Sequence, residues 1–74
     1  SYYTAKDGLI SIATVNETQF KKFCTHVLRD SEFHTRYPTI RNRVDEQERF
    51  ENELNQLLIT RDREYWLAEC KKHD

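Results

Sequence analysis

The chain has 74 residues, of which 36% are hydrophobic and 34% are charged, and its formal net charge is −1. This length allows one small domain, and no apolar run reaches the roughly 18–20 residues that a membrane-spanning helix needs. The near balance of 12 basic and 13 acidic residues disfavours a dedicated nucleic-acid surface, and two cysteines are too few for a disulfide-rich secreted module. We therefore expect a single cytoplasmic unit spanning residues 1–74.

The first 15 residues predict a β-hairpin. Aromatic and β-branched residues on both sides of Asp7 and Gly8 are typical of strands, and an Asp-Gly pair is typical of a two-residue turn. The second strand is partly apolar on both faces. Because a two-stranded hairpin is marginal in water, helices or further strands must cover it.

A helix is expected over residues 17–28. Asn16 is a good N-cap residue, and Gln19 is placed to complete a capping box. Val15 and Phe20 have the spacing of a hydrophobic staple. The helix has one apolar stripe, formed by Phe20, Phe23, Cys24, Val27 and Leu28.

Three further helical segments follow. A short helical turn is expected at 31–35, capped by Asp30 or Ser31, and Pro38 separates it from the next helix. A long helix is expected over 40–59 with Thr39 as its cap, and its apolar stripe comprises Ile40, Val44, Phe50, Leu54, Leu57 and Leu58. A last helix is expected over 62–72, capped by Thr60, with an apolar edge formed by Trp66, Leu67 and Cys70. The expected fold is α+β: an N-terminal β-hairpin followed by three main helices.

One set of residues has the composition of a zinc site. Cys24, His26, Cys70 and His73 supply two thiols and two imidazoles, which is the right number for tetrahedral zinc. However, both cysteines lie on predicted core faces, and residues two apart on a helix point in nearly opposite directions. The same separation argues against a Cys24–His26 catalytic pair. We therefore interpret these cysteines as core residues and expect no metal site.

No other motif indicates chemistry. A chain with one glycine has no phosphate-binding glycine-rich loop. The basic residues are interleaved with acids, which is typical of a solvated helix face, and they comprise Lys21, Lys22, Arg41, Arg43 and Arg49. The aromatic residues Tyr2, Tyr3 and Trp66 are interpreted as core or interface anchors. We expect no catalytic and no cofactor-binding residue in this chain.

The order and spacing of several segments resemble one known family. The segments are residues 4–13 (TAKDGLISIA), Asn16 with Gln19 and Phe20, Phe23 with Cys24, 29–33 (RDSEF), 37–44 (YPTIRNRV), Thr60 with Arg61, and 66–68 (WLA). Together they resemble the small domain of class III CoA-transferases, the formyl-CoA and carnitine-CoA transferase superfamily, over essentially the whole chain. The family usually has Asn where this chain has Ile40, and it commonly has a Gly-Arg-Pro-Glu type turn where this chain has residues 28–32. These departures affect a cap and a turn and leave the expected fold unchanged.

The resemblance implies that this chain is a fragment of a larger transferase. In the family, an aspartate of a large Rossmann-like domain attacks the acyl-CoA thioester, and CoA then moves to a carboxylic acid acceptor. That domain also binds coenzyme A, which is a substrate of the parent enzyme. The family's small domain covers the active-site cleft in an interlocked homodimer and continues past the position of Asp74 to the large domain. The expected partners are therefore the large domain and a second subunit, and the isolated chain is expected to be inactive.

Two alternatives remain open at the level of the sequence. The parent enzyme is also consistent with an α-methylacyl-CoA racemase of the same superfamily. A different class of function is a free-standing helical interaction module of the FF-domain sort, which the positions of Phe20, Phe23 and Phe50 loosely fit. Such a module would not need the N-terminal hairpin, so the role of residues 1–15 in the core discriminates between the two classes.

Overall fold

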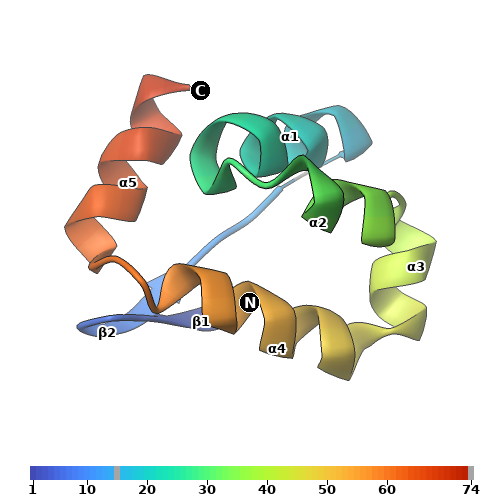
Figure 1. The fold of residues 1–74 in the computed structure, drawn as a ribbon, viewed down its shortest axis with the longest axis horizontal. Helices are drawn as coiled ribbons and strands as arrows, with labels where there is room; N and C mark the ends of the chain where they lie inside the picture. Colours follow the sequence, from blue (N-terminus) through green and yellow to red (C-terminus); the bar gives the residue numbers. More distant parts are fainter. Residues whose placement is uncertain (15, 74) are drawn as a thin grey trace.

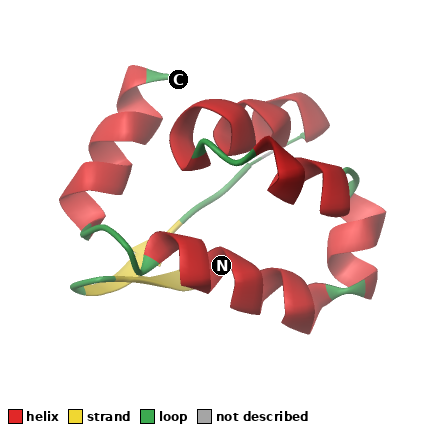
Figure 2. Cartoon of the chain, viewed as in Figure 1, coloured by secondary structure: helices red, strands yellow, loops and turns green. Residues whose placement is uncertain are grey.

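The computed structural model describes residues 1–14 and 16–73 and confirms the α+β fold. An N-terminal hairpin precedes a series of helices (Figure 2). The elements are β1 (Tyr2–Ala5), β2 (Gly8–Ser11), α1 (Glu17–Lys22), the π-helix η1 (Phe23–Leu28), α2 (Ser31–Arg36), α3 (Ile40–Asp45), α4 (Gln47–Leu58) and α5 (Arg63–Lys72).

The elements form two layers that are joined at both ends. Figure 1 shows α1, η1 and α2 on one side and α4 with the hairpin on the other, while α3 and α5 lie at opposite ends. Residues 12–14 run from β2 toward the layer that contains α1. The core between the layers contains Tyr3, Ala5, Ile10, Phe20, Phe23, Cys24, Val27, Phe33, Tyr37, Phe50, Leu54, Leu58 and Trp66.

The hairpin differs from the sequence prediction in the position of its turn. Ala5 pairs with Gly8, so Lys6 and Asp7 form the two-residue turn, and Gly8 is the first residue of β2. Gly8 has a φ of 145°, which only glycine adopts without strain. The Asp7 carboxylate accepts a hydrogen bond of 2.8 Å from the backbone N–H of Arg63, so the turn is fastened to the start of α5.

The predicted helix over residues 17–28 is present, but its second half is a π-helix. The Asn16 side chain accepts a hydrogen bond of 2.9 Å from the Gln19 N–H, which confirms the N-cap. Arg29 ends η1 in the left-handed conformation with a φ of 56°. The predicted contact between Val15 and Phe20 lies outside the described residues.

The predicted long helix over 40–59 is instead two helices that meet at Glu46. Glu46 has φ −112° and ψ 33°, which are not helical angles, although Thr39 caps α3 as expected. Residues 45–49 are all charged or polar, so no apolar anchor in this stretch opposes a change of direction. As a consequence, the stripe of α4 enters the core, whereas Ile40 and Val44 of α3 are 53% and 63% exposed.

The short helix α2 and the last helix α5 have side-chain caps. Asp30, not Ser31, caps α2 by accepting a hydrogen bond from the Phe33 N–H. The prediction that Thr60 caps the last helix is wrong, because the Asp62 carboxylate accepts from the Tyr65 N–H at 3.0 Å and α5 begins at Arg63. The Thr60 hydroxyl instead donates to the carbonyl of Leu57 at the end of α4.

The apolar edge of α5 is narrower than predicted. Trp66 is buried, and Cys70 packs against the core from one turn further along the same face. Leu67 was expected on this edge, but it is 56% exposed because it lies about 100° around the helix from Trp66. The indole N–H of Trp66 donates a hydrogen bond of 2.8 Å to the carbonyl of Leu58, which joins α5 to α4.

Candidate functional site

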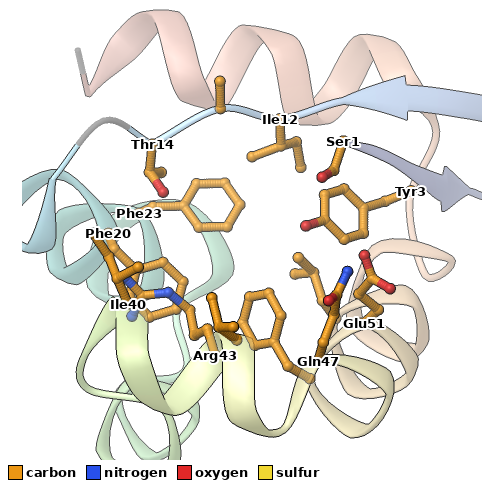
Figure 3. A pocket seen from close by; sticks show the side chains of 14 residues that line it. Ser1, Tyr3, Ile12, Thr14, Phe20, Phe23, Ile40, Arg43, Gln47 and Glu51 are labelled. Atoms are coloured by element: carbon orange, nitrogen blue, oxygen red, sulfur yellow. The ribbon is translucent and has the colours of Figure 1, made fainter.

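The candidate site is a cleft between the hairpin and the helices α3 and α4. We call it the hairpin cleft; Ser1, Tyr3 and residues 12–14 form one wall, and Phe23, Val44, Phe50 and Leu54 are among the residues of the other. The cavity has a volume of about 350 Å³. In Figure 3 the rings of Tyr3 and Phe23 point toward one another from opposite sides of it. Its size is within the range of small-molecule sites.

The lining of the hairpin cleft combines apolar and polar groups. Ile12, Phe23 and Phe50 supply aliphatic and aromatic surface, while Tyr3 and Glu51 add a hydroxyl and a carboxylate. Burial raises the pKa of the Tyr3 phenol above its ordinary value of 10.0. Tyr3 therefore remains a neutral hydrogen-bonding group at physiological pH.

Arg43 organises the wall of the cleft and is not available to a ligand. Its guanidinium donates a hydrogen bond of 2.7 Å to the carbonyl of Tyr37 and pairs with the carboxylate of Glu17. The guanidinium carbon also lies 3.9 Å from the centre of the Phe20 ring, which is a cation–π contact. Because only 11% of the Arg43 side chain is exposed, its role is structural.

Glu17 joins α1 to the start of α3 beside this wall. Its carboxylate accepts a hydrogen bond of 2.6 Å from the backbone N–H of Ile40 in addition to its pairing with Arg43. The hydrogen bond from Arg43 is the main reason that the pKa of Glu17 lies below its ordinary value of 4.5. The negative charge of Glu17 is therefore part of the folded structure at neutral pH.

Cys24 fills the core and does not have the surroundings of a nucleophile. Its side chain is fully buried, and burial raises the pKa of the thiol to about 12. A reactive cysteine requires a lowered pKa and access to substrate. His26 is exposed on the outer surface of η1, as the helical spacing predicted, so it does not form a pair with Cys24.

The four residues that have the composition of a zinc site do not lie together. The rings of His26 and His73 stack at a centroid distance of 5.3 Å, across the contact between η1 and α5. Cys24 lies in the core, and Cys70 lines a second cavity with His73. Among residues 1–14 and 16–73, no three His, Cys, Asp or Glu side chains are grouped so that they could hold a metal ion.

Two of the basic side chains that the sequence singled out, Arg41 and Arg49, lie next to acids. Arg41 pairs with Asp45 at 3.5 Å, and Arg49 lies 3.9 Å from Glu53. Pairing of this kind reduces the positive potential that attracts a nucleic acid. Of the predicted aromatic anchors, Tyr3 and Trp66 are buried, whereas Tyr2 is 74% exposed.

Sequence reasoning did not identify the hairpin cleft. Its walls come from the N-terminus, from the segment after β2 and from α1, η1, α3 and α4, which are separated by up to about 50 positions. The only local signal was the alternation of apolar residues along the hairpin, which places Tyr3 and Ile12 on its inner side. No pattern in the sequence indicated that the break at Glu46 would leave Val44 in the cleft wall.

Comparison with known proteins identifies a family. The family model described as CoA-transferase family III matches residues 1–74. No curated protein and no solved structure matches the chain. In the described part of the chain, no helix is both long enough and apolar enough to cross a bilayer. Because the match extends over the whole sequence, the chain belongs to CoA-transferase family III.

Proposed function

We propose that this chain is the small domain of a class III CoA-transferase, an enzyme that moves CoA from an acyl-CoA donor to a carboxylic acid acceptor. The observation that carries the proposal is the family match over all 74 residues. The chain's own cysteine in the core, Cys24, is protonated and buried, so it supplies no nucleophile. The attacking carboxylate and the CoA site would belong to the large domain of the parent enzyme.

The hairpin cleft suggests how the small domain would contribute. Its apolar wall of Ile12, Phe23 and Phe50 is suited to an acyl group and not to the phosphates of CoA. A cover of this kind would exclude water from reactive acyl intermediates and so reduce their hydrolysis. In this proposal the partners of the chain are the large domain and a second subunit of an interlocked homodimer.

The first test is an assay of the isolated chain. We expect no transfer of CoA between short acyl-CoA donors and carboxylate acceptors, measured by chromatography of the acyl-CoA products. The control is the Cys24→Ser variant, which should be equally inactive. Turnover by the isolated chain that depends on protein concentration would contradict the assignment to a non-catalytic domain.

The second test replaces the small domain of a CoA-transferase of this family with residues 1–74. We expect the chimera to retain transferase activity, and we expect Val44→Asp in the cleft wall to lower it by raising the hydrolysis of the acyl-CoA donor. Val44 is 63% exposed, so the substitution leaves the core intact. The same replacement in an α-methylacyl-CoA racemase tests the alternative parent enzyme. If residues 1–74 support exchange of the α-proton in the racemase chimera but no CoA transfer in the transferase chimera, the α-methylacyl-CoA racemase is favoured.

The helical interaction module is disfavoured by the hairpin itself. Tyr3, Ala5 and Ile10 are all buried in the core, so the hairpin is an integral part of the fold. We expect deletion of residues 1–15 to abolish the helical circular dichroism signal. A truncated chain that retained its helicity and its melting transition would support the interaction module.

A further inference from the structure

A further cavity lies at the outer surface, where the C-terminal end of α5 meets η1. Figure 1 shows this end of α5 beside the helix that α1 and η1 form together. We call the cavity the imidazole pocket; it has a volume of about 440 Å³ and is lined by Thr25, His26, Arg29, Ser31 and His73. It shares no lining residue with the hairpin cleft, so it is a separate site.

The lining of the imidazole pocket consists of hydrogen-bond donors. Thr25 and Ser31 each supply a hydroxyl at an exposed position. The other three lining side chains are two imidazoles and one guanidinium, and no carboxylate is among them. A wall of donors that includes a permanent positive charge is suited to an anion and not to a cation or an apolar group.

The two imidazoles hold a fixed position relative to each other. Their rings stack with centroids 5.3 Å apart and planes 15° apart. His26 belongs to η1 and His73 ends α5, so the packing of the two helices sets this arrangement. The Nε2 atom of His73 is buried and makes no hydrogen bond within the described residues, so the ring still has an unsatisfied polar atom. A pair of donors that is already in place loses little entropy when a ligand binds.

Arg29 supplies the permanent charge of the pocket. Its backbone is left-handed with a φ of 56°, a conformation that glycine adopts at the lowest cost. Its Nη2 atom lies 3.5 Å from Oε1 of Glu69, and 67% of the arginine side chain is exposed. An exposed ion pair of this kind contributes little to stability. Neither the backbone nor the ion pair therefore accounts for an arginine here, and a guanidinium has five N–H donors, of which this pair uses one.

The acids beside the pocket already accept hydrogen bonds. The Asp30 carboxylate accepts from the Phe33 N–H at the start of α2, and Glu69 pairs with Arg29. The last turn of α5 adds the positive charges of Lys71 and Lys72. An anion that enters the pocket therefore meets donors and nearby positive charge, which raises its local concentration.

We propose that the imidazole pocket binds a dianionic phosphate group, either inorganic phosphate or the phosphate of a monoester. The planar guanidinium of Arg29 matches two phosphate oxygens, and the hydroxyl and imidazole groups of the pocket donate to the others. A carboxylate has one charge and two oxygens, so it uses fewer of these donors. The volume of about 440 Å³ leaves room for the organic part of a small monoester.

The test is a titration of the native chain with sodium phosphate, followed by NMR of the histidine imidazoles. The pH and the ionic strength are held constant, because salt screens exposed charges. The signals of His26 and His73 should shift together, with a dissociation constant of about 1–10 mM. His34 is the internal control; its ring packs near that of Phe20, with centroids 5.9 Å apart, and its signals should not shift.

Variants of two arginines test the role of the guanidinium. Arg29→Gln should weaken phosphate binding by at least about tenfold, because hydrogen bonds to charged groups are the strongest. Arg41→Gln removes the same charge from an exposed arginine that pairs with Asp45 in α3, and this matched control should bind like the native chain. Arg29→Lys keeps the charge without the planar fork and should bind with intermediate affinity. All three variants should have the circular dichroism spectrum of the native chain.

Glycerol 3-phosphate distinguishes the two sources of the phosphate group. Binding at least as tight as that of inorganic phosphate identifies a monoester as the ligand, and weaker binding identifies the free ion. Three results would overturn the proposal: imidazole signals that phosphate does not move, an equal response to acetate, and equal weakening by Arg29→Gln and Arg41→Gln. These measurements do not involve transferase activity, so their outcome is separate from that of the proposed function.

Discussion

The carboxylate of Glu17, at the first position of α1, pairs with the guanidinium of Arg43 in α3. The two residues are 26 positions apart, and their contact closes the end of the molecule where the two layers meet. The Arg43 guanidinium also lies over the Phe20 ring, and the Glu17 carboxylate accepts a hydrogen bond from the N–H of Ile40, the first residue of α3. The Glu17–Arg43 ion pair therefore connects the start of α3, the Phe20 ring in the core and the wall of the hairpin cleft.

This pairing predicts that stability falls in acid. Folding lowers the pKa of Glu17, so its contribution is fully present above the ordinary value of 4.5 and is lost as the pH falls through the lower folded value. The pKa of Asp7 is also lowered, mainly by the hydrogen bond from the Arg63 N–H, and its contribution is lost in the same direction. Thermal melting followed between pH 7 and pH 3 should show the decline beginning below about pH 4.5.

The Glu17→Gln variant distinguishes the contribution of Glu17 to acid sensitivity from that of Asp7. It should melt at a lower temperature than the native chain at pH 7 and should lose less stability on acidification. Glu48→Gln, at an exposed position on α4, is the matched control and should behave like the native chain. Equal acid sensitivity of Glu17→Gln and the native chain would show that the ion pair does not contribute.

Phe33 is predicted to be essential for the fold. It is fully buried and its ring lies 5.4 Å from those of both Tyr37 and Phe50. Phe33→Ala should cost about 3–5 kcal/mol, which is comparable to the whole stability of a domain of this size. We expect loss of the cooperative urea transition, whereas Leu67→Ala on the exposed face of α5 should change stability by less than about 1 kcal/mol. A cooperative Phe33→Ala variant of near-native stability would contradict this description of the core.

Arg29 is a position where glycine should be preferred. Its φ of 56° brings Cβ close to the backbone, and its N–H together with that of Asp30 donates to the Cys24 carbonyl. Arg29→Gly should be more stable than Arg29→Ala by about 1 kcal/mol, because both remove the exposed ion pair with Glu69 and only glycine relieves the strain. Urea denaturation of the two variants measures the difference, and equal midpoints would show that this strain is absent.

The buried thiol of Cys24 should be unreactive in the folded protein. With a pKa of about 12, only about one thiol in ten thousand is ionised at pH 8. Mass spectrometry after brief iodoacetamide treatment should show modification of Cys70, which is partly exposed, and modification of both cysteines in guanidinium chloride. Rapid native labelling of Cys24 would indicate an open core, and Cys24→Ser identifies the site of labelling.

Much of the local structure was predictable because its causes lie within a few residues. Asn16 and Thr39 cap their helices as the sequence indicated, since a cap requires only a suitable side chain three residues before an N–H. The exposed position of His26 relative to Cys24 likewise follows from helical spacing alone. The order of segments along the whole chain was sufficient to indicate the family, which the comparison confirmed.

Where several local solutions were similar in energy, tertiary contacts decided between them. Thr60 was the cap expected from the sequence, but Asp62 caps α5, and the next residue, Arg63, donates its backbone N–H to Asp7 in the hairpin turn. The helix predicted over 40–59 breaks at Glu46. The ion pair of Arg43 with Glu17 fixes the direction of α3, whereas the burial of Phe50 directs α4 toward the core. These anchors lie far apart in the sequence, so no periodicity reveals their competing directions.

The sequence by itself determined the class of fold, most of the helix starts, the burial of Cys24 and the family of the chain. Only the tertiary structure decided the position of the hairpin turn, the break between α3 and α4, the cleft between them and the hairpin, and the imidazole pocket. The physical reason is the range of the interactions: caps and helical stripes act within a few residues, whereas a cleft or a pocket exists only where distant segments meet.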